Sequence, residues 1–492
     1  SGGSGIGGAE TAVLTTAPSF FWTDPRPAVA GAEISLGWEL LGAPAGTTVD
    51  LFAGPVGGDQ APLAAALPPV GSFLWDTSAL PPGLYTLRLA YGAAGGAVAG
   101  EATRTVLVHH EGILHGGRLA SDESWAAGVL HIVTDDLEIP SGVTLTLAAG
   151  ALVKVAEGRT LRVLPGGALV SGGTPGAPAV FTSLRDDSLG GDDNADGALT
   201  SPAPGDWGGI RVETGTALPA SDILVLRYGT REHGGSLAAS AVWPADTLHW
   251  VRDDVTVPGG MTLSVEPGAT VVFDYGRVLS VSGTLQAIGA IGAPIRMTSS
   301  YDSGAFGMAY GPYAGHMPAP GDWHCVYVGD GGAGTFDRVH FRYGAGRQTG
   351  YDSTAMVRGR RSTVVLQNCR IEDTQYDGVL VDWPTDTTRT ELVNCIVAGC
   401  DIGFRAADNA AGICQVVNSS FYDNRIGVHL AWGSTSNPRV VRNSIIAASR
   451  EIGYYLWGGG TVFESNNVWG SGTTNYLGGL ADQTGKNGNI SA

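Results

Sequence analysis

The sequence predicts an all-β protein in which an N-terminal β-sandwich precedes a parallel β-helix, a solenoid of stacked coils. Short runs that alternate apolar and polar residues are separated by Gly, Pro and Asn along the whole chain, as expected for strands joined by tight turns. One long stretch is duplicated, and the last third repeats a short Asn-containing pattern every 24–26 residues. Repeats of that length indicate stacked units, because a single unit cannot bury its apolar face alone.

The composition supports this prediction and argues against several function classes. Gly contributes 76 of the 492 residues and only 15% of residues are charged, which is typical of a turn-rich β-protein. The net charge of −18 would repel a polyanion, so nucleic acid is not an expected partner. The sequence contains no apolar run of membrane-spanning length, so membrane insertion is not expected either. An acidic surface is compatible with an extracellular or cell-surface location and with divalent cations.

Residues 1–17 are predicted to form a tail. It begins with a Gly- and Ser-rich segment and then contains one short apolar run. We expect this run to add a strand to the sheet of a neighbouring subunit, the alternative being a frayed terminus. The assembly residues are therefore Thr11, Ala12, Val13, Leu14, Thr15 and Thr16.

Residues 18–108 are predicted to form the β-sandwich. Five short strand-like runs follow one another here, with turn residues between them. The segment from Trp75 to Leu89 resembles the end of bacterial immunoglobulin-like and fibronectin type III modules, where the same turn precedes a Gly-x-Tyr-x-Leu strand. That resemblance implies a spacer or binding module without catalysis. Residues 109–124 are expected to be a linker.

A duplication divides the next part of the chain into two modules. Trp125 recurs 118 residues later as Trp243, and many neighbouring residues recur at the same offset. The run Pro-Gly-Asp-Trp that ends at Trp207 recurs at Trp323. Each copy consists of short strands of alternating apolar and polar residues, separated by Gly or Pro-Gly corners, which is the pattern typical of a solenoid. The two modules span residues 125–229 and 243–344.

Residues 345–492 are predicted to form further coils and a cap. An Asn recurs here at intervals of 26, 24 and 25 residues, and amides in register on successive coils can stack into a hydrogen-bonded ladder. Cys369 and Cys395 fall in one column of adjacent coils, so we expect stacked thiols there instead of a disulfide. The ladder residues are Asn368, Asn394, Asn418 and Asn443.

The duplicated part also carries a family likeness. The run Val-Pro-Gly-Gly-Met-Thr-Leu-Ser-Val-Glu-Pro-Gly-Ala-Thr-Val at 257–271, and Pro-Ala-Pro-Gly-Asp-Trp at 202–207 and 318–323, resemble a module of bacterial secreted and cell-surface proteins. The fold of that module is a right-handed parallel β-helix. The resemblance covers residues 125–344 and implies an extracellular, rod-like protein with a structural or adhesive role.

An acidic loop in the first module is the candidate metal site. Asp192-Asp-Asn-Ala-Asp-Gly197 matches the start of a calcium loop, which needs oxygen ligands at alternate positions and a Gly for its tight turn. Position 12 of such a loop is Ala203 instead of the usual bidentate Glu, and a solvated acidic loop is the alternative. The second module lacks the cluster. The predicted Ca²⁺ ligands are Asp186, Asp187, Asp192, Asn194 and Asp196.

A polysaccharide-cleaving enzyme is the alternative that most needs weighing, because many parallel β-helices cleave acidic polysaccharides. Such an enzyme needs clustered carboxylates with a basic residue, or two carboxylates at a set separation. The candidate residues fall at differing positions on their coils, so catalysis is not expected. They are Asp373, Asp377, Asp382 and Asp401, with Arg370 or Arg405 as the base.

His131 and His249 occupy equivalent positions in the two modules. A ligand pair would have to come from one module, and we expect no second histidine near either residue. Packing or capping is therefore the interpretation we favour for both. The Trp residues that recur with the modules are likewise expected at structural corners.

Together these observations predict a non-enzymatic, extracellular structural or adhesive protein. The two ends of a β-helix are open edges that invite stacking, so we expect a homo-polymer joined through the tail or the β-helix ends, such as a surface filament or matrix. The alternatives are a monomeric adhesin that binds glycans and, less favoured, a polysaccharide lyase or hydrolase.

Overall fold

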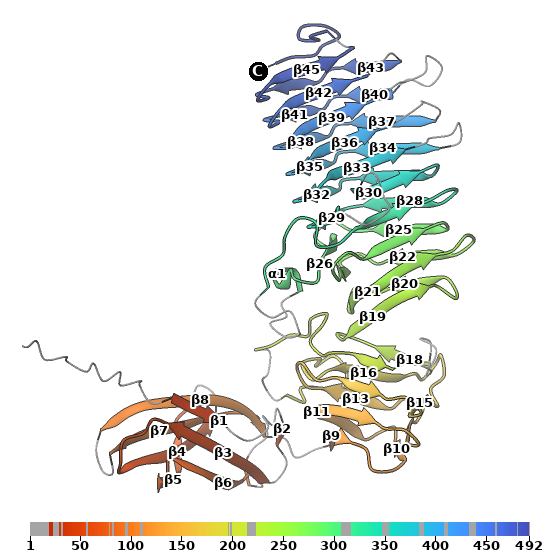
Figure 1. The fold of residues 1–492 in the computed structure, drawn as a ribbon. Coiled ribbons are helices and arrows are strands. Elements are labelled where there is room, and N and C mark those ends of the chain that lie inside the picture. The colour runs from red at the N-terminus through yellow and green to blue at the C-terminus, as the bar shows by residue number, and fades with distance from the viewer. Residues whose placement is uncertain are drawn as a thin grey trace, which may run out of the picture.

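The computed structural model confirms the all-β fold class (Figure 1). Small N-terminal sheets, antiparallel in the main, precede a parallel β-solenoid of about 13 turns. The single helix among the described residues, α1 (Ser303–Phe306), is too short to cross a membrane, and the strands carry the rest of the fold.

The structure describes residues 19–22, 29–30, 33–55, 58–77, 79–80, 83–93, 97–108, 112–194, 196, 199–213, 223–306, 316–346, 354–382, 388–407, 412–431, 439–457, 460–479 and 481–491. The predicted assembly residues Thr11–Thr16 and Gly197 of the acidic loop lie outside these ranges.

The N-terminal unit consists of two sheets that contribute to one core. Trp38 and Trp75 come from one sheet and Leu51 and Leu87 from the other, and all four are buried in one apolar cluster. Every strand pair is antiparallel except β2 with β8. The first sheet runs β1 (Ser19–Trp22), β3 (Glu33–Leu41), β6 (Val70–Asp76); the second runs β2 (Val29–Ala30), β8 (Val98–Val108), β7 (Gly83–Ala93), β4 (Thr47–Pro55), β5 (Ala61–Leu67).

Each full turn of the solenoid contributes strands to three parallel faces, which we name A, B and C. Four long strands bend at a register shift or turn, and each contributes its first half to face A and its second half to face B. They are β9 (Ile113–Arg118), β11 (Leu130–Ile139), β19 (Thr230–Ser236) and β21 (Leu248–Val257).

The remaining strands belong to one face each. Face A contains β13 (Leu152–Val155), β16 (Ala179–Ser183), β18 (Leu224–Leu226), β23 (Thr270–Phe273), β26 (Ile295–Ser299), β29 (Val339–Arg342), β32 (Arg370–Glu372), β35 (Ile396–Ala398), β38 (Ser420–Tyr422), β41 (Ile445–Ala447) and β44 (Asn467–Trp469). Face B contains β14 (Leu161–Val163), β17 (Ile210–Val212), β24 (Val278–Val281), β27 (Cys325–Val328), β30 (Ala355–Arg360), β33 (Asp377–Asp382), β36 (Ile402–Ala406), β39 (Ile426–Leu430), β42 (Ile452–Leu456) and β45 (Thr474–Gly478). Face C contains β10 (Glu123–Trp125), β12 (Thr144–Leu147), β15 (Ala168–Ser171), β20 (Ala241–Trp243), β22 (Thr262–Val265), β25 (Thr284–Ile288), β28 (Ala333–Asp337), β31 (Thr363–Gln367), β34 (Arg389–Val393), β37 (Ile413–Val417), β40 (Arg439–Arg442) and β43 (Thr461–Glu464).

The solenoid begins earlier than the sequence suggests. β9 lies inside the segment 109–124 that was predicted to be a linker, and it pairs in parallel with β11. β19 plays the same part for the second module, since it pairs with β21 across an equivalent register shift. Both strands contain a Gly-Gly pair, whose low strand propensity conceals them in the sequence.

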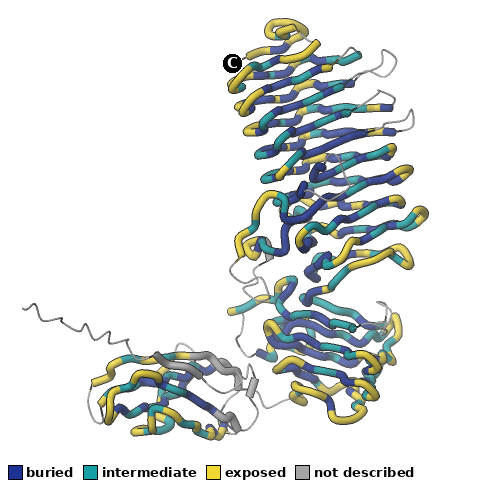
Figure 2. The backbone as a smooth tube through the Cα atoms, in the orientation of Figure 1, coloured by how far each residue is buried: buried dark blue, intermediate teal, exposed yellow. Residues whose placement is uncertain are grey.

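The core of the solenoid falls into two clusters of buried residues, one for each side of the boundary between the modules. Figure 2 shows the buried positions alternating along the tube with more exposed ones. At the boundary, the Thr230 N–H donates to the Trp207 carbonyl at 3.0 Å, and the ion pairs Arg227–Asp246 and Arg211–Glu232 span 3.3 and 3.1 Å. Polar contacts therefore join two blocks whose apolar interiors are separate among the described residues.

Candidate metal centre

The loop between β16 and β17 crosses the outer side of face A in the first module. Three consecutive outward positions beneath it, Ile132, Lys154 and Thr182, are fully buried although their side chains point away from the core. A Cβ on Gly190 of the loop would lie 3.0 Å from Leu152 and 3.4 Å from Lys154, so the loop packs directly against the sheet. This docking brings the acidic residues of the loop onto a rigid surface.

Lys154 is the buried anchor of the loop. Its Nζ donates to the Gly191 carbonyl at 2.7 Å and forms an ion pair with Asp193. Only charge-assisted contacts of this kind make a fully buried ammonium tolerable. The position 118 residues later is Val272, which packs against Leu248 and Trp250. The module with the acidic loop thus has the lysine, and the module without it has an aliphatic residue.

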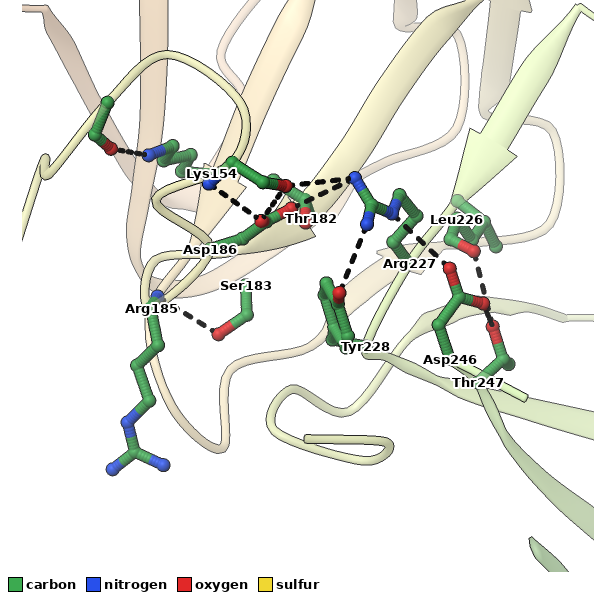
Figure 3. Close-up of polar contacts among 12 residues, drawn as sticks. Lys154, Thr182, Ser183, Arg185, Asp186, Leu226, Arg227, Tyr228, Asp246 and Thr247 are labelled. Carbon is green, nitrogen blue, oxygen red and sulfur yellow. Dashed lines mark hydrogen bonds and ion pairs between the residues drawn. The ribbon is translucent and has the colours of Figure 1, made fainter. Parts of the chain in front are cut away.

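Asp186 is not among the clustered carboxylates that could hold an ion in the described part of the chain, and its contacts belong to the framework. It accepts from Thr182 Oγ1 and Ser188, and its Oδ2 lies 3.3 Å from Arg227 (Figure 3). These hydrogen bonds and the Arg227 charge hold the pKa of Asp186 below its usual range despite its burial. The second module repeats the contact, because Thr298 Oγ1 donates to Asp302 at 2.7 Å. An interaction present in both modules cannot be specific to the acidic loop.

Three other carboxylates do come together. Asp187, Asp192 and Asp196 each offer an oxygen within 4.8 Å of the others. Asn194 lies beside them, since its Nδ2 donates to Asp196 Oδ2 at 2.8 Å. Burial and the neighbouring Asp192 raise the pKa of Asp187. The structure therefore unites four of the five predicted ligands.

The residues present fit a hard divalent cation. Three side-chain oxygens are buried and receive no hydrogen bond from the described residues. They are the Oδ1 atoms of Asp187, Asn194 and Asp196. Asn194 and Asp196 are only 7% and 8% exposed. Leaving buried carboxylate and amide oxygens without donors is costly unless a cation replaces the donors. Ca²⁺ takes six to eight oxygens of these types.

The carboxylates proposed for the enzyme alternative are all engaged in ion pairs. Asp377 lies 2.7 Å from Arg405 Nε, and Asp373 lies 3.1 Å from Arg342. The remaining pairs are Asp382 with Arg358, Asp401 with Arg425, and Arg370 with Glu372. Burial raises the pKa of Asp377 to about 7, with Arg405 opposing the rise. The four aspartates are thus engaged in ion pairs between turns, whereas Arg370 pairs with Glu372 of its own strand β32.

The predicted ladder asparagines lie at one corner of successive turns, between faces C and A. All four are exposed and left-handed, with φ between 51° and 56°, a conformation that Asn tolerates better than most residues. Their backbone N–H groups donate to the next turn, and the Asn394 amide donates to Asn368 Oδ1 at 3.4 Å. Another amide contact joins two buried asparagines near the C-terminus, where Asn466 Nδ2 donates to Asn489 Oδ1 at 3.3 Å.

The cysteines carry no disulfide among the described residues. All five thiols are free, and Cys369 and Cys395 are buried on adjacent turns. Burial and the neighbouring Cys395 raise the pKa of the Cys369 thiol. The expected thiol stack is therefore consistent with the structure.

The expectation that His131 and His249 have no histidine partner is wrong. His115 Nε2 lies 3.0 Å from His131 Nδ1, and Trp125 stacks on both rings. The second module repeats this cluster with His233, Trp243 and His249. The added histidines sit on β9 and β19, outside the assumed module boundaries. Their separation of 118 residues, the same as that of the duplication, is the signal that would have found them.

Comparison with known proteins supports the fold. Residues 324–445 match the family model of the right-handed beta helix region, in agreement with the parallel solenoid turns that the structure has there. The chain is also similar to a crystal structure of the periplasmic alginate epimerase AlgG, at 8% identity over 75% of this chain and 77% of that one, with a TM-score of 0.25. A score this low supports no conclusion about activity. None of the curated proteins matches the chain.

Proposed function

We propose that this chain is a non-enzymatic structural or adhesive protein of the extracellular space or cell surface, and that its solenoid serves as a stiff rod. The observation that carries the proposal is the unbroken parallel pairing from β19 to β45 around one apolar core. Each turn is hydrogen-bonded to the next, so bending requires many bonds to break together. Ion pairs between turns, such as Arg425 with both Asp401 and Glu451, add to this stiffness.

The ion proposed for the acidic loop is Ca²⁺, because the ligand set consists of carboxylate and amide oxygens without Cys or His. Isothermal titration calorimetry of chelator-treated protein should show one Ca²⁺ site. Asp196→Asn should remove it, whereas Asp302→Asn, at the framework position of the other module, should retain it. Equal loss in both variants would place the site elsewhere.

Homo-polymerisation through the tail or the β-helix ends is part of the proposal. β9 pairs only with β11, and β45 only with β42, so each presents an open edge among the described residues. Open edges template further strands. Negative-stain microscopy should reveal fibres, and deletion of residues 1–17 should abolish them while the far-ultraviolet circular dichroism is retained. Fibres that survive the deletion would exclude the tail as the joint.

A monomeric glycan-binding adhesin is the second candidate, and aromatic side chains on face B favour it. His429 and Tyr455 stack at 4.5 Å, and the neighbouring Trp457 is 59% exposed. Exposed aromatic rings suit sugar stacking. Glycan-array binding that is lost in Trp457→Ala, by a protein that runs as a monomer, would favour this function over the filament. Cleavage of acidic polysaccharide, seen as rising ultraviolet absorbance, would contradict both.

A further inference from the structure

The acidic loop concentrates negative charge against face A. Five aspartates lie between positions 186 and 196. Arg227 compensates Asp186, and Lys154 compensates Asp193. The other three form the carboxylate triad, and two of those three have a buried oxygen that receives no hydrogen bond within the described residues.

Lys154 contributes its charge to this loop in an unusual way. It is one of two lysines in the chain, its side chain is fully buried, and it reaches the loop from β13, a strand more than thirty residues earlier. The aliphatic Val272 at the equivalent position shows that this surface of the fold does not require a cation. Of the two modules, only the one with the acidic loop has a lysine at this position, so the lysine is a feature of the loop and not a requirement of the β-helix.

We propose that Lys154 sets the cation affinity of the loop, acting as a fixed internal counter-ion that holds the loop in place without metal and weakens the binding of Ca²⁺. This inference rests on the Ca²⁺ site proposed above. A loop docked by Lys154 does not have to fold when the ion arrives, so binding carries little ordering cost. The buried positive charge repels the ion at the same time. The site is thereby tuned to the weak range of extracellular calcium modules, about 10⁻⁴–10⁻³ M.

The two partners of the Lys154–Asp193 ion pair should then have opposite effects. Lys154→Met keeps the length of the side chain and removes its charge. We expect the lost repulsion to outweigh the added cost of ordering the loop, so Ca²⁺ binding should tighten by roughly fivefold to tenfold at low salt. Asp193→Asn leaves the lysine uncompensated beside the site and should weaken binding by a similar factor. The gain in Lys154→Met should shrink at high ionic strength, because salt screens the repulsion.

Calorimetric titration of the full chain with CaCl₂ measures these changes, and Lys486→Met provides the matched control. Lys486 is the other lysine and lies near the C-terminus, where it donates to the Asp482 carbonyl. Its replacement should leave the Ca²⁺ affinity unchanged. Limited proteolysis without Ca²⁺ should cut the loop faster in Lys154→Met than in the parent, and added Ca²⁺ should restore protection.

Weaker binding in both Lys154→Met and Asp193→Asn would overturn the proposal, because it would mean that the ion pair only shapes the loop. Failure of Lys154→Met to fold would also contradict it, since Val272 predicts that this position tolerates an apolar side chain. If the parent itself binds no Ca²⁺, the proposed metal site fails first. A parent that binds Ca²⁺ with an affinity unchanged in Lys154→Met retains the site and refutes the role of the lysine.

Discussion

His233 Nε2 lies 2.9 Å from His249 Nδ1 inside the second module, and the Trp243 ring stacks on both. His249 Nε2 lies a further 2.9 Å from the Pro244 carbonyl. A neutral ring has one N–H to share, so the pair forms a chain in which His249 donates to the carbonyl and accepts from His233. A charged pair cannot satisfy this arrangement, because each imidazolium has no acceptor nitrogen.

Stability should therefore fall in mild acid. Burial, together with the His131 charge, lowers the pKa of His115 to about 4, and burial lowers the pKa of His249 to about 3. These rings stay neutral in the folded protein, whereas the unfolded chain takes up protons near pH 6.5. The stability is complete above that pH and is lost as the pH falls toward the folded-state values, by about 1.4 kcal/mol per pH unit for each such histidine.

Thermal unfolding between pH 4 and 8 measures this loss. The double variant His233→Gln/His249→Gln should show a shallower decline below pH 6.5, because two titrating groups are gone. His316→Asn, at an exposed position, is the matched control and should follow the parent. An unchanged slope in the double variant would mean that acid acts on other groups.

The repeated tryptophans should matter for stability and not for binding. Trp323 is fully buried, stacks on Phe273 at 4.2 Å and donates its indole N–H to the Arg342 carbonyl at 2.8 Å. Trp323→Ala should cost about 3–5 kcal/mol in denaturant unfolding, from lost burial and the resulting cavity. Trp457→Ala, at an exposed site, should cost less than about 1 kcal/mol. Equal costs would contradict the packing described here.

The corner asparagines should respond to backbone conformation more than to loss of the amide. Asn394 has φ 56° and an exposed side chain. Asn394→Gly should be close to neutral, because Gly adopts this conformation freely. Asn394→Ala should destabilise by about 1 kcal/mol, since Ala keeps the Cβ that disfavours this conformation but lacks the polar group by which Asn tolerates it. If Gly and Ala cost the same in urea unfolding, amide stacking is the stronger contribution.

The thiols should be inaccessible but unoxidised. Burial raises the pKa of Cys325 and Cys400 to about 12 and that of Cys414 to about 11. Four of the five cysteines are buried and Cys414 is half-buried, and protonated thiols shielded from solvent react slowly. The native protein should therefore react slowly with Ellman's reagent, and unfolding without reductant should expose five thiols per chain. A count of three reactive thiols per unfolded chain would mean that two cysteines form a disulfide.

Much of the architecture was predictable because a solenoid converts sequence repeats directly into spatial ones. The offset of 118 residues between Trp125 and Trp243 identifies two structurally equivalent turns, and the interval between Asn368 and Asn394 is one full turn. The acidic loop was also recognisable, since oxygen ligands at alternate positions are a local pattern. Alternating burial within a strand is likewise a local property of the pleat.

What the sequence by itself determined is thus the all-β class, the repeated turn and the chemical type of the candidate metal site. Only the tertiary structure decided which side chains meet across turns. It assigned Asp186 to Arg227, placed Lys154 beneath the loop and paired His115 with His131. These contacts depend on how a loop docks on an outer face and where the first turn begins. Neither is encoded in a local period, because both arise from packing between segments distant in the chain.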